Sequence, residues 1–344
     1  MQKNKEDRMH SFLKYPGGKS KEVTLVLNNL PNYIERYIEP FVGGGSIFFA
    51  INKSSSYIND ISTDLYYLYK LIKEQNVKLK KYLLSFDKYW HDLNEKKVEK
   101  ISFSEDFLST EKFNEFYAFS KKKKNITINK LESDGKKISD TDLIKIEITA
   151  RKTAFYMLIR NVYNNKINNK VIRAACFYFL REYCYSSMFR FSSKGDFNVP
   201  YGGMSYNNKY LKSKIEYIFS NKMKEYLSNT IIENKDFARF LDDIELKEDD
   251  FIFLDPPYDS DFSTYDNNPF DKNEQIRLRD YLLSTPSKWM LIIKKTDFIY
   301  DLYKNFNIYE YNMNYVVSFK NRNDKDVKHL LITNYDLKRE KKNG

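Results

Sequence analysis

Short apolar runs alternate with helix-like stretches near both ends of the chain. The runs lie at residues 37–39, 57–59, 230–232, 251–254, 289–293, 315–319 and 330–334. Runs of this length, several of them closed by an acidic residue or a turn, are typical of buried strands. Because helical periodicity lies between them, as at 273–283, the pattern predicts an α/β fold with a mostly parallel sheet covered on both faces. The polar run 320–328 is too short for a helical crossover, so the last two strands should form an antiparallel hairpin at one edge.

The middle of the chain has a helical pattern instead. Residues 65–84 and 144–163 repeat apolar positions at a spacing of three and four, which favours helices. Between them, 121–142 is charged, poor in apolar residues and begins with four lysines. We expect a solvated loop or a partly disordered insertion there, with a DNA-contacting arm as the alternative. The pattern therefore predicts two parts, a sheet domain at 1–64 and 207–344 and a mostly helical insertion at 65–206.

The composition favours an anionic partner. The chain of 344 residues has a formal net charge of +11, and 17% of its residues are aromatic. The charge indicates nucleic acid before a membrane, and the rings could stack on bases as well as fill the core. With three histidines in all we expect no metal site, and Cys176 and Cys184 should be buried, reduced thiols. No apolar run approaches about 18 residues and none follows Met1–Arg8, so neither a membrane span nor a secretion signal is expected.

The run 251–254 ends in Asp255-Pro256-Pro257-Tyr258. This motif sets a carboxylate, a proline carbonyl and an aromatic face around one point, which suits holding a planar exocyclic amine. The two prolines have a fixed φ and no N–H donor, so the loop cannot continue the strand and keeps one shape. A proline-rich turn after a core strand is the alternative for this motif taken alone.

A glycine turn follows the run 37–39, with the sequence Glu-Pro-Phe-Val-Gly-Gly-Gly-Ser at 39–46. Glycines at a strand-to-helix turn allow left-handed φ values and let a ligand approach the backbone. The spacing differs from Gly-x-Gly-x-x-Gly, so a pyrophosphate clamp is not indicated. Asp60, about twenty residues later, stands where a carboxylate would accept hydrogen bonds from a ribose diol. Together these features fit a nucleoside that lacks phosphates.

A third segment, Phe-Leu-Lys-Tyr-Pro-Gly-Gly-Lys, occupies residues 12–19. It is either a flexible lead with a Pro-Gly turn or a loop that presents backbone amides and Lys19 to a carboxylate. The methionyl tail of S-adenosylmethionine would supply such a carboxylate.

In the order in which they occur along the chain, the three segments resemble the Dam-like (class alpha, D12) group of N6-adenine DNA methyltransferases. The resemblance covers residues 12–65, 173–203 and 230–335. The resemblance implies a Rossmann-like methyltransferase sheet with an inserted helical DNA-recognition domain, S-adenosylmethionine as cofactor and double-stranded DNA as substrate. It implies catalysis by Asp255, Pro256, Pro257 and Tyr258. The cofactor contacts that it implies are Tyr15, Gly17, Gly18, Lys19, Glu39, Phe41, Gly43, Gly45, Asp60, Asp236, Phe237 and Asp255, with Asp236 and Phe237 flanking the cofactor adenine.

The resemblance also implies a DNA-reading hairpin near 183–203. Tyr185 would wedge into the base stack, Met188 would contact a base methyl group, and Arg190 would read a guanine edge. The predicted DNA contacts are Lys14, Arg173, Tyr185, Ser186, Met188, Arg190 and Asn198. Core packing is the alternative for an aromatic hairpin, but its serines and Lys194 favour exposure. Ser186 and Ser187 replace the Asn-Gly of close Dam relatives, so a GATC target is not carried over.

We therefore predict sequence-specific methylation of adenine N6 in duplex DNA, with the target adenine flipped out of the stack. The alternatives are the same fold acting on cytosine N4, RNA adenine or a protein glutamine, and an inactive fold that serves as a DNA-binding regulator. A housekeeping methylase, the companion of a restriction endonuclease and a phage enzyme all stay open. We expect a cytoplasmic, nucleoid-associated monomer in a bacterial or phage-infected cell.

Overall fold

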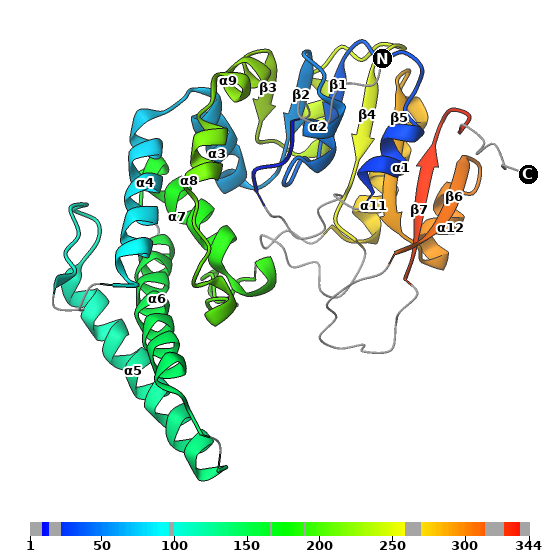
Figure 1. Cartoon of the computed structure of the whole chain (residues 1–344). Coiled ribbons are helices and arrows are strands. Elements are labelled where there is room, and N and C mark those ends of the chain that lie inside the picture. The colour runs from blue at the N-terminus through cyan, green and yellow to red at the C-terminus, as the bar shows by residue number, and fades with distance from the viewer. Residues whose placement is uncertain are drawn as a thin grey trace, which may run out of the picture. The chain divides into compact units, whose positions relative to one another are not determined.

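The computed structural model of the chain describes residues 9–13, 22–95, 100–135, 137–165, 167–188, 190–258, 270–313 and 327–337. The chain divides into two compact units. The sheet unit consists of Met1–Ser11, Gly17–Tyr66 and Tyr226–Gly344, and the helical unit of Phe12–Pro16 and Tyr67–Glu225 (Figure 1). The division of labour between a catalytic domain and a target-recognition insertion at 65–206 stays a prediction.

The sheet unit contains a seven-stranded sheet in the order β3-β2-β1-β4-β5-β7-β6. The first five strands of this order are parallel, whereas β7 runs antiparallel to both β5 and β6. The predicted α/β fold, with a mostly parallel sheet and an antiparallel C-terminal hairpin, is confirmed. The strands are β1 Tyr37–Glu39, β2 Ser56–Asn59, β3 Thr230–Glu233, β4 Phe251–Leu254, β5 Lys288–Lys294, β6 Asn307–Met313 and β7 Val327–Thr333.

The strand β6 lies earlier in the chain than the pattern predicted. The run 315–319, expected to be the first strand of the hairpin, lies outside the described residues, and β6 at Asn307–Met313 pairs with β7. The sequence of β6, Asn-Ile-Tyr-Glu-Tyr-Asn-Met, has no apolar run because β6 is the edge strand. Edge strands keep polar residues where central strands cannot.

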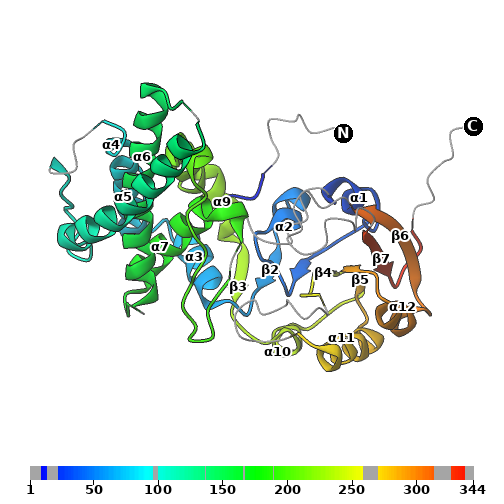
Figure 2. The same cartoon turned by 90° about the horizontal axis from the view of Figure 1, so that it is seen from below.

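Helices cover both faces of this sheet. Figure 2 shows α1 and α2 on one face and α10, α11 and α12 on the other. On the latter face, Phe240, Leu278 and Tyr303 pack in one buried cluster with Ile252 and Leu291 of the sheet. Burial of each such side chain contributes about 1.5–3 kcal/mol. The helices are α1 Val23–Asn28, α2 Ser46–Ile51, α10 Phe237–Asp242, α11 Lys272–Ser284 and α12 Asp297–Tyr303.

The helical unit has an aromatic core. The rings of Trp90 and Tyr183 lie 4.2 Å apart, and those of Phe155 and Phe179 lie 5.5 Å apart. Cys176 and Cys184 are both buried here, as predicted. The helices are α4 Val77–Asp92, α5 Thr110–Ser133, α6 Asp140–Asn164, α7 Lys170–Tyr183 and α8 Lys212–Ile218, while α3 Thr63–Lys73 and α9 Asn221–Ser228 each contain a boundary between the units. In the part of the chain that the structure describes, no helix could span a membrane.

One prediction for the middle of the chain needs correction. The charged segment 121–142, predicted as a loop, is mostly helical, since α5 continues to Ser133 and α6 begins at Asp140. Ser109 and Ser139 cap these helices, and a 2.5 Å ion pair between Lys124 and Glu147 joins them. Lysine and glutamate are good helix formers, so high charge is compatible with an exposed helix.

The stretch 65–84 is helical, as predicted, and is divided between two helices, α3 and α4. Gln75 adopts a left-handed φ of 52° between α3 and α4. The Asn76 side chain then accepts a hydrogen bond from the Leu79 amide and caps the second helix. The apolar spacing predicted helix correctly but did not reveal the break.

Candidate active site

The glycine turn and the Asp-Pro-Pro-Tyr motif meet at one edge of the sheet. The turn follows β1 and the motif follows β4, and these two strands are parallel neighbours. The strand order reverses between them, because β2 and β3 lie on one side and β4 and β5 on the other. In open α/β sheets, ligands bind in the crevice at the carboxyl ends of the strands where the order reverses. The candidate active site is therefore this edge of the sheet unit.

The glycine turn needs glycine at two positions. Gly43 has a φ of 48° and Gly45 a φ of 71°, in the left-handed region where a Cβ costs about 1–2 kcal/mol. The Gly43 amide donates to Oδ2 of Asp60 and the Ser62 amide to Oδ1, each at 2.9 Å. Asp60 thus holds the turn after β1 against the loop after β2. Each carboxylate oxygen has a second lone pair, and the predicted ribose contact stays a prediction.

Asn59 is a third element of this edge that sequence reasoning missed. The buried side chain donates to the carbonyls of Pro40 and Lys235 at 3.0 Å each and accepts from the Lys235 amide at 2.8 Å. It therefore fastens the loops after β1 and β3 to the end of β2. The signal was present, because an amide at the end of the apolar run 57–59 has to find partners once it is buried.

Glu39 lies in the same negatively charged region. It is buried, and the Tyr37 hydroxyl donates to its Oε2 at 2.8 Å. Burial raises the pKa of Glu39 well above the ordinary value, and the charges of Asp255 and Asp60 raise it further, against a lowering by the Tyr37 hydrogen bond. Asp60 and Asp255 thus place negative charge near Glu39, and such a region favours a cationic group.

Asp236 and Phe237 lie at the start of α10. Asp236 caps the helix by accepting from the Ala238 amide at 3.1 Å. Arg277 of α11 pairs with Asp236 through two hydrogen bonds, 2.9 Å to Oδ1 and 2.6 Å to Oδ2. These hydrogen bonds from Arg277 lower the pKa of Asp236. The Arg277 guanidinium also lies 4.2 Å from the centroid of the Phe237 ring, which in turn is 5.6 Å from the Phe41 ring.

The Asp-Pro-Pro-Tyr loop is fastened from α11. Asp255 and Tyr258 are half-buried, and Pro256 is buried. The Pro257 carbonyl accepts a 3.0 Å hydrogen bond from the fully buried Gln275 side chain. Sequence reasoning missed Gln275 and Arg277. A signal existed for Gln275, which occupies an apolar position of α11 together with Leu278 and Leu282.

The predicted DNA-reading segment is a hairpin of the helical unit. Backbone hydrogen bonds join Tyr185 to Pro200 at 2.9 Å and Gly202 to Tyr183 at 3.0 Å. The Asn164 side chain of α6 binds both backbone groups of Phe197, at 3.0 and 2.9 Å. The hairpin is thus a defined structure held by α6, and Asn164 is a support that the sequence pattern did not reveal.

The structure brings Arg190 and Asn198 together on this hairpin. Arg190 is exposed, and its Nε donates to Oδ1 of Asn198 at 2.9 Å. Tyr185 is 38% exposed, and Met188 is half-buried. Arg173 lies on α7, with its guanidinium 4.4 Å from the centroid of the Tyr163 ring.

The turn at the hairpin's start has an unusual backbone. Ser186 and Ser187 have φ values of 51° and 53°, and the Met188 amide donates to the Tyr185 carbonyl at 3.0 Å. Two left-handed central residues define a turn that Asn-Gly suits best. The serines therefore adopt the backbone that the Asn-Gly of the resembled family would favour.

Five of the predicted contacts cannot be placed. Lys14, Tyr15, Gly17, Gly18 and Lys19 lie outside the described residues.

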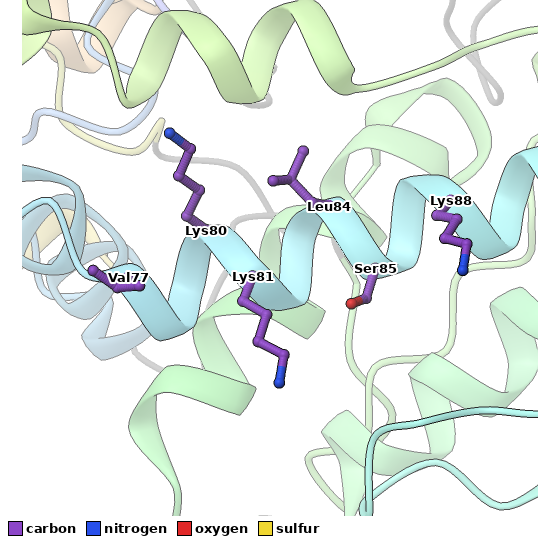
Figure 3. A pocket seen from close by; sticks show the side chains of 6 residues that line it. All are labelled: Val77, Lys80, Lys81, Leu84, Ser85 and Lys88. Atoms are coloured by element: carbon purple, nitrogen blue, oxygen red, sulfur yellow. The ribbon is translucent and has the colours of Figure 1, made fainter.

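A shallow concavity of about 400 Å³ runs along α4 (Figure 3). Its lining contains no carboxylate, whereas the candidate active site contains several. The concavity is lined by Val77, Lys80, Lys81, Leu84, Ser85 and Lys88.

Comparison with known proteins gives a consistent assignment. The model of the D12 class N6 adenine-specific DNA methyltransferase family matches residues 15–317. A type II methyltransferase of Paramecium bursaria Chlorella virus NC1A is 26% identical and covers 95% of this chain and 100% of its own length. One of Methanocaldococcus jannaschii is 29% identical, over 94% of this chain and 98% of its own length. One of Lactococcus lactis subsp. cremoris is 25% identical, over 97% of this chain and 98% of its own length.

The family uses S-adenosylmethionine to methylate adenine N6 in DNA. The predicted activity, cofactor and DNA substrate are thereby confirmed, and the alternatives of cytosine N4, RNA adenine and glutamine are set aside. Because the match covers most of the chain, and two of the motifs that resemble the family follow neighbouring parallel strands of its sheet, this chain belongs to the D12 class of N6 adenine-specific DNA methyltransferases.

Proposed function

We propose that methyl transfer takes place at the carboxyl edge between β1 and β4, where Asp255, Pro256 and Tyr258 hold the target adenine. The observation that carries this proposal is the meeting of the half-buried Asp255 and Tyr258 with the glycine turn where the strand order reverses. N6 lies inside the duplex, so the adenine must leave the base stack, which costs a few kcal/mol.

Each group of the motif has a distinct task. Tyr258 offers an aromatic face to the flipped base, while the Asp255 carboxylate and the Pro256 carbonyl accept hydrogen bonds from the N6 amino group. This alignment directs the nitrogen lone pair toward the sulfonium methyl group and offsets the positive charge that develops on N6. Pro257 keeps the loop rigid, and Gln275 fixes its carbonyl at 3.0 Å. The transfer is direct, without a covalent enzyme intermediate.

The residues of this edge fit the cofactor. S-adenosylmethionine supplies a methyl group activated by a positively charged sulfonium. The nearby carboxylates of Asp60 and Asp255 favour a positive charge at this edge, as their raising of the pKa of Glu39 indicates. Gly43 and Gly45 leave the backbone without side chains at the turn. Where the cofactor adenine is predicted to lie, Phe41 and Phe237 supply aromatic surface. Asp236 lies beside them as a polar group.

The hairpin near 183–203 would read the target sequence. Tyr185 would enter the stack beside the adenine, Met188 would contact a base methyl group and Ser186 would touch the DNA backbone. Arg190 would bind N7 and O6 of a guanine, because a planar guanidinium matches that pair of acceptors. Its 2.9 Å hydrogen bond to Asn198 holds Nε and leaves the two Nη groups to face the base.

The biological setting is also a proposal. The three relatives described above are named type II methyltransferases, which supports a role beside a cognate restriction endonuclease. Because the substrate is DNA, we propose a cytoplasmic, nucleoid-associated enzyme of a bacterial or phage-infected cell, acting as a monomer.

The first experiment tests the catalytic loop. The target site is mapped by methylation-aware sequencing of DNA from cells that express the chain, and turnover is then measured on that site. Asp255→Ala should lower the transfer rate about 10²- to 10⁴-fold, far more than it lowers cofactor affinity. Asp301→Ala on α12, an exposed carboxylate outside the motifs, serves as the control. Near-normal turnover of Asp255→Ala would contradict the assigned role.

A second experiment tests base reading. Arg190→Ala should cost about 1–3 kcal/mol on the mapped site and relax the preference at one base pair. Arg190→Lys should restore little, since an ammonium group lacks the fork. The variants are assayed on a library of single-position variants of the site, with Lys194→Ala in the same hairpin as the control. An equal loss on every library member would make Arg190 a phosphate contact.

A further inference from the structure

Three polar side chains from distant parts of the sequence meet beside Tyr258. Glu22 precedes α1, Tyr311 lies in β6 and His329 in β7. The Tyr311 hydroxyl donates to Oε1 of Glu22 at 2.5 Å, and Nδ1 of His329 lies 3.1 Å from the same oxygen. Glu22 is 3% exposed and His329 is completely buried. Buried polar groups of this kind form a cluster that fixes the geometry of each member.

The sheet topology carries this cluster to the active-site edge. In register, His329 pairs with Lys294, the last residue of β5, and with Tyr311 of β6. Because β7 is antiparallel, its beginning lies beside the carboxyl end of β5, where the parallel strands also end. The ring of His329 contacts that of Tyr258, with centroids 5.6 Å apart and planes at 81°.

Both contacts of the cluster converge on one oxygen of Glu22. Burial raises the pKa of Tyr311, and the neighbouring Glu22 raises it further, so Tyr311 is a neutral phenol that donates a hydrogen bond to Glu22. The same Glu22 oxygen lies within hydrogen-bonding distance of His329 Nδ1, and this contact restricts the orientation of the imidazole ring. The plane that His329 presents to Tyr258 is therefore determined by Glu22.

The His329 ring is one of the contacts of the Tyr258 side chain, which also packs against the core cluster of the sheet unit. The two prolines before Tyr258 restrict the backbone, and contacts of this kind restrict the side-chain torsion angles. A base can stack productively only on a ring whose plane is held in place.

We propose that His329, anchored by Glu22, is a positioning residue that holds the Tyr258 ring in the orientation that receives the target adenine. This inference rests on the proposed role of Tyr258. Tyr311 completes the cluster by sharing the Glu22 oxygen, so the loss of either donor changes the position of the carboxylate.

The experiment uses duplex DNA with 2-aminopurine in place of the target adenine, together with single-turnover methylation of the natural site. Tyr258→Ala first establishes how the fluorescence of the bound duplex changes when the stacking ring is lost. His329→Ala should shift the fluorescence in the same direction and lower the methylation rate about 10- to 100-fold, with little change in the dissociation constant of S-adenosylmethionine.

Leu331→Ala is the matched control, because Leu331 is equally buried on the same face of β7, two residues farther from the edge. It should lower the melting temperature without the fluorescence change. Glu22→Ala should reproduce the His329→Ala defect, and Glu22→Gln, which keeps an acceptor oxygen, should recover a large part of the lost rate.

Each outcome decides the matter. Normal fluorescence and rate in His329→Ala would overturn the inference, and so would equal defects in His329→Ala and Leu331→Ala, which would make His329 a core residue only. A wild-type result for Glu22→Ala would remove the anchor. Normal behaviour of Tyr258→Ala would instead refute the proposed role of Tyr258 itself, and the inference would fall with it.

Discussion

At the scale of single residues, Ser186 and Ser187 show how a backbone conformation can persist without its preferred side chains. Both have positive φ values, although the Cβ of serine makes that region sterically unfavourable. The turn is retained because hydrogen bonds at the base of the hairpin and contacts from α6 fix the flanking strands. Local strain is tolerated where the surroundings determine the conformation.

We predict that Ser187→Gly stabilises the protein by about 1 kcal/mol, because glycine adopts the left-handed conformation without the steric cost. Urea and thermal unfolding measure the effect. Ser193→Gly in the same hairpin is the control, because Ser193 does not have a positive φ and glycine should destabilise there. Equal effects at the two positions would contradict the explanation.

A second residue-scale prediction concerns the pH dependence of stability. Burial and nearby carboxylates raise the pKa of Glu39, so the folded protein keeps a proton that the unfolded chain releases near pH 4.3, the usual value for glutamate at about 25 °C. The stability that this group contributes is therefore lost as the pH rises from that value through the raised pKa. Glu39→Gln replaces the side chain by an isostere of the protonated acid. Its melting temperature should exceed that of the wild type by a difference that grows from acidic to neutral pH. A difference that does not vary with pH would contradict this.

At the scale of elements, α11 connects two functions. Its residue Gln275 holds the Asp-Pro-Pro-Tyr loop through the Pro257 carbonyl, and two residues later Arg277 pairs with Asp236 at the predicted adenine side. One rigid helix thus fixes the spacing between the catalytic loop and the loop after β3. A small displacement of such an element can cost a large factor in rate.

Variants of α11 should separate these two functions. Gln275→Leu should lower the turnover number about 10- to 100-fold, because the catalytic loop loses its support. Arg277→Met should mainly weaken S-adenosylmethionine binding, by about two- to fivefold, since a half-exposed ion pair contributes about 0.2–1 kcal/mol. Steady-state kinetics and calorimetry distinguish the two, with the exposed Asp280→Ala as the control. The reverse pattern would show that the roles were assigned wrongly.

At the scale of the whole molecule, net charge determines how the enzyme meets its substrate. The chain carries 58 lysines and arginines against 47 acidic residues. Basic side chains that neutralise phosphates release counterions, and this release makes affinity depend on salt.

We predict that DNA affinity falls steeply with salt, linearly in a plot of log affinity against log salt concentration, with a slope of about −0.9 per phosphate contact. Fluorescence anisotropy of labelled DNA measures the slope. S-adenosylmethionine affinity, followed in parallel, should change little because its recognition involves few exposed charges. A flat plot for DNA would mean that phosphate contacts do not drive binding.

The sequence by itself determined the fold class and the two motifs that meet at the sheet edge. Apolar runs and helical periodicity are local patterns, and they predicted the α/β alternation and the antiparallel hairpin. The glycine turn and the Asp-Pro-Pro-Tyr motif could be recognised because their backbone requirements lie within a few residues. The positive φ values of Gly43 and Gly45 confirm the backbone conformation predicted for the glycine turn.

Only the tertiary structure decided which side chains support those motifs. Asn59 binds a loop 176 residues away, and Glu22 meets His329 across 307 positions. Burial and strand register create these contacts, and neither is encoded in a short window of sequence. The helical state of the charged segment after Lys121 was hidden for a similar reason, because its stability comes from packing of α5 on α6 as much as from its own composition.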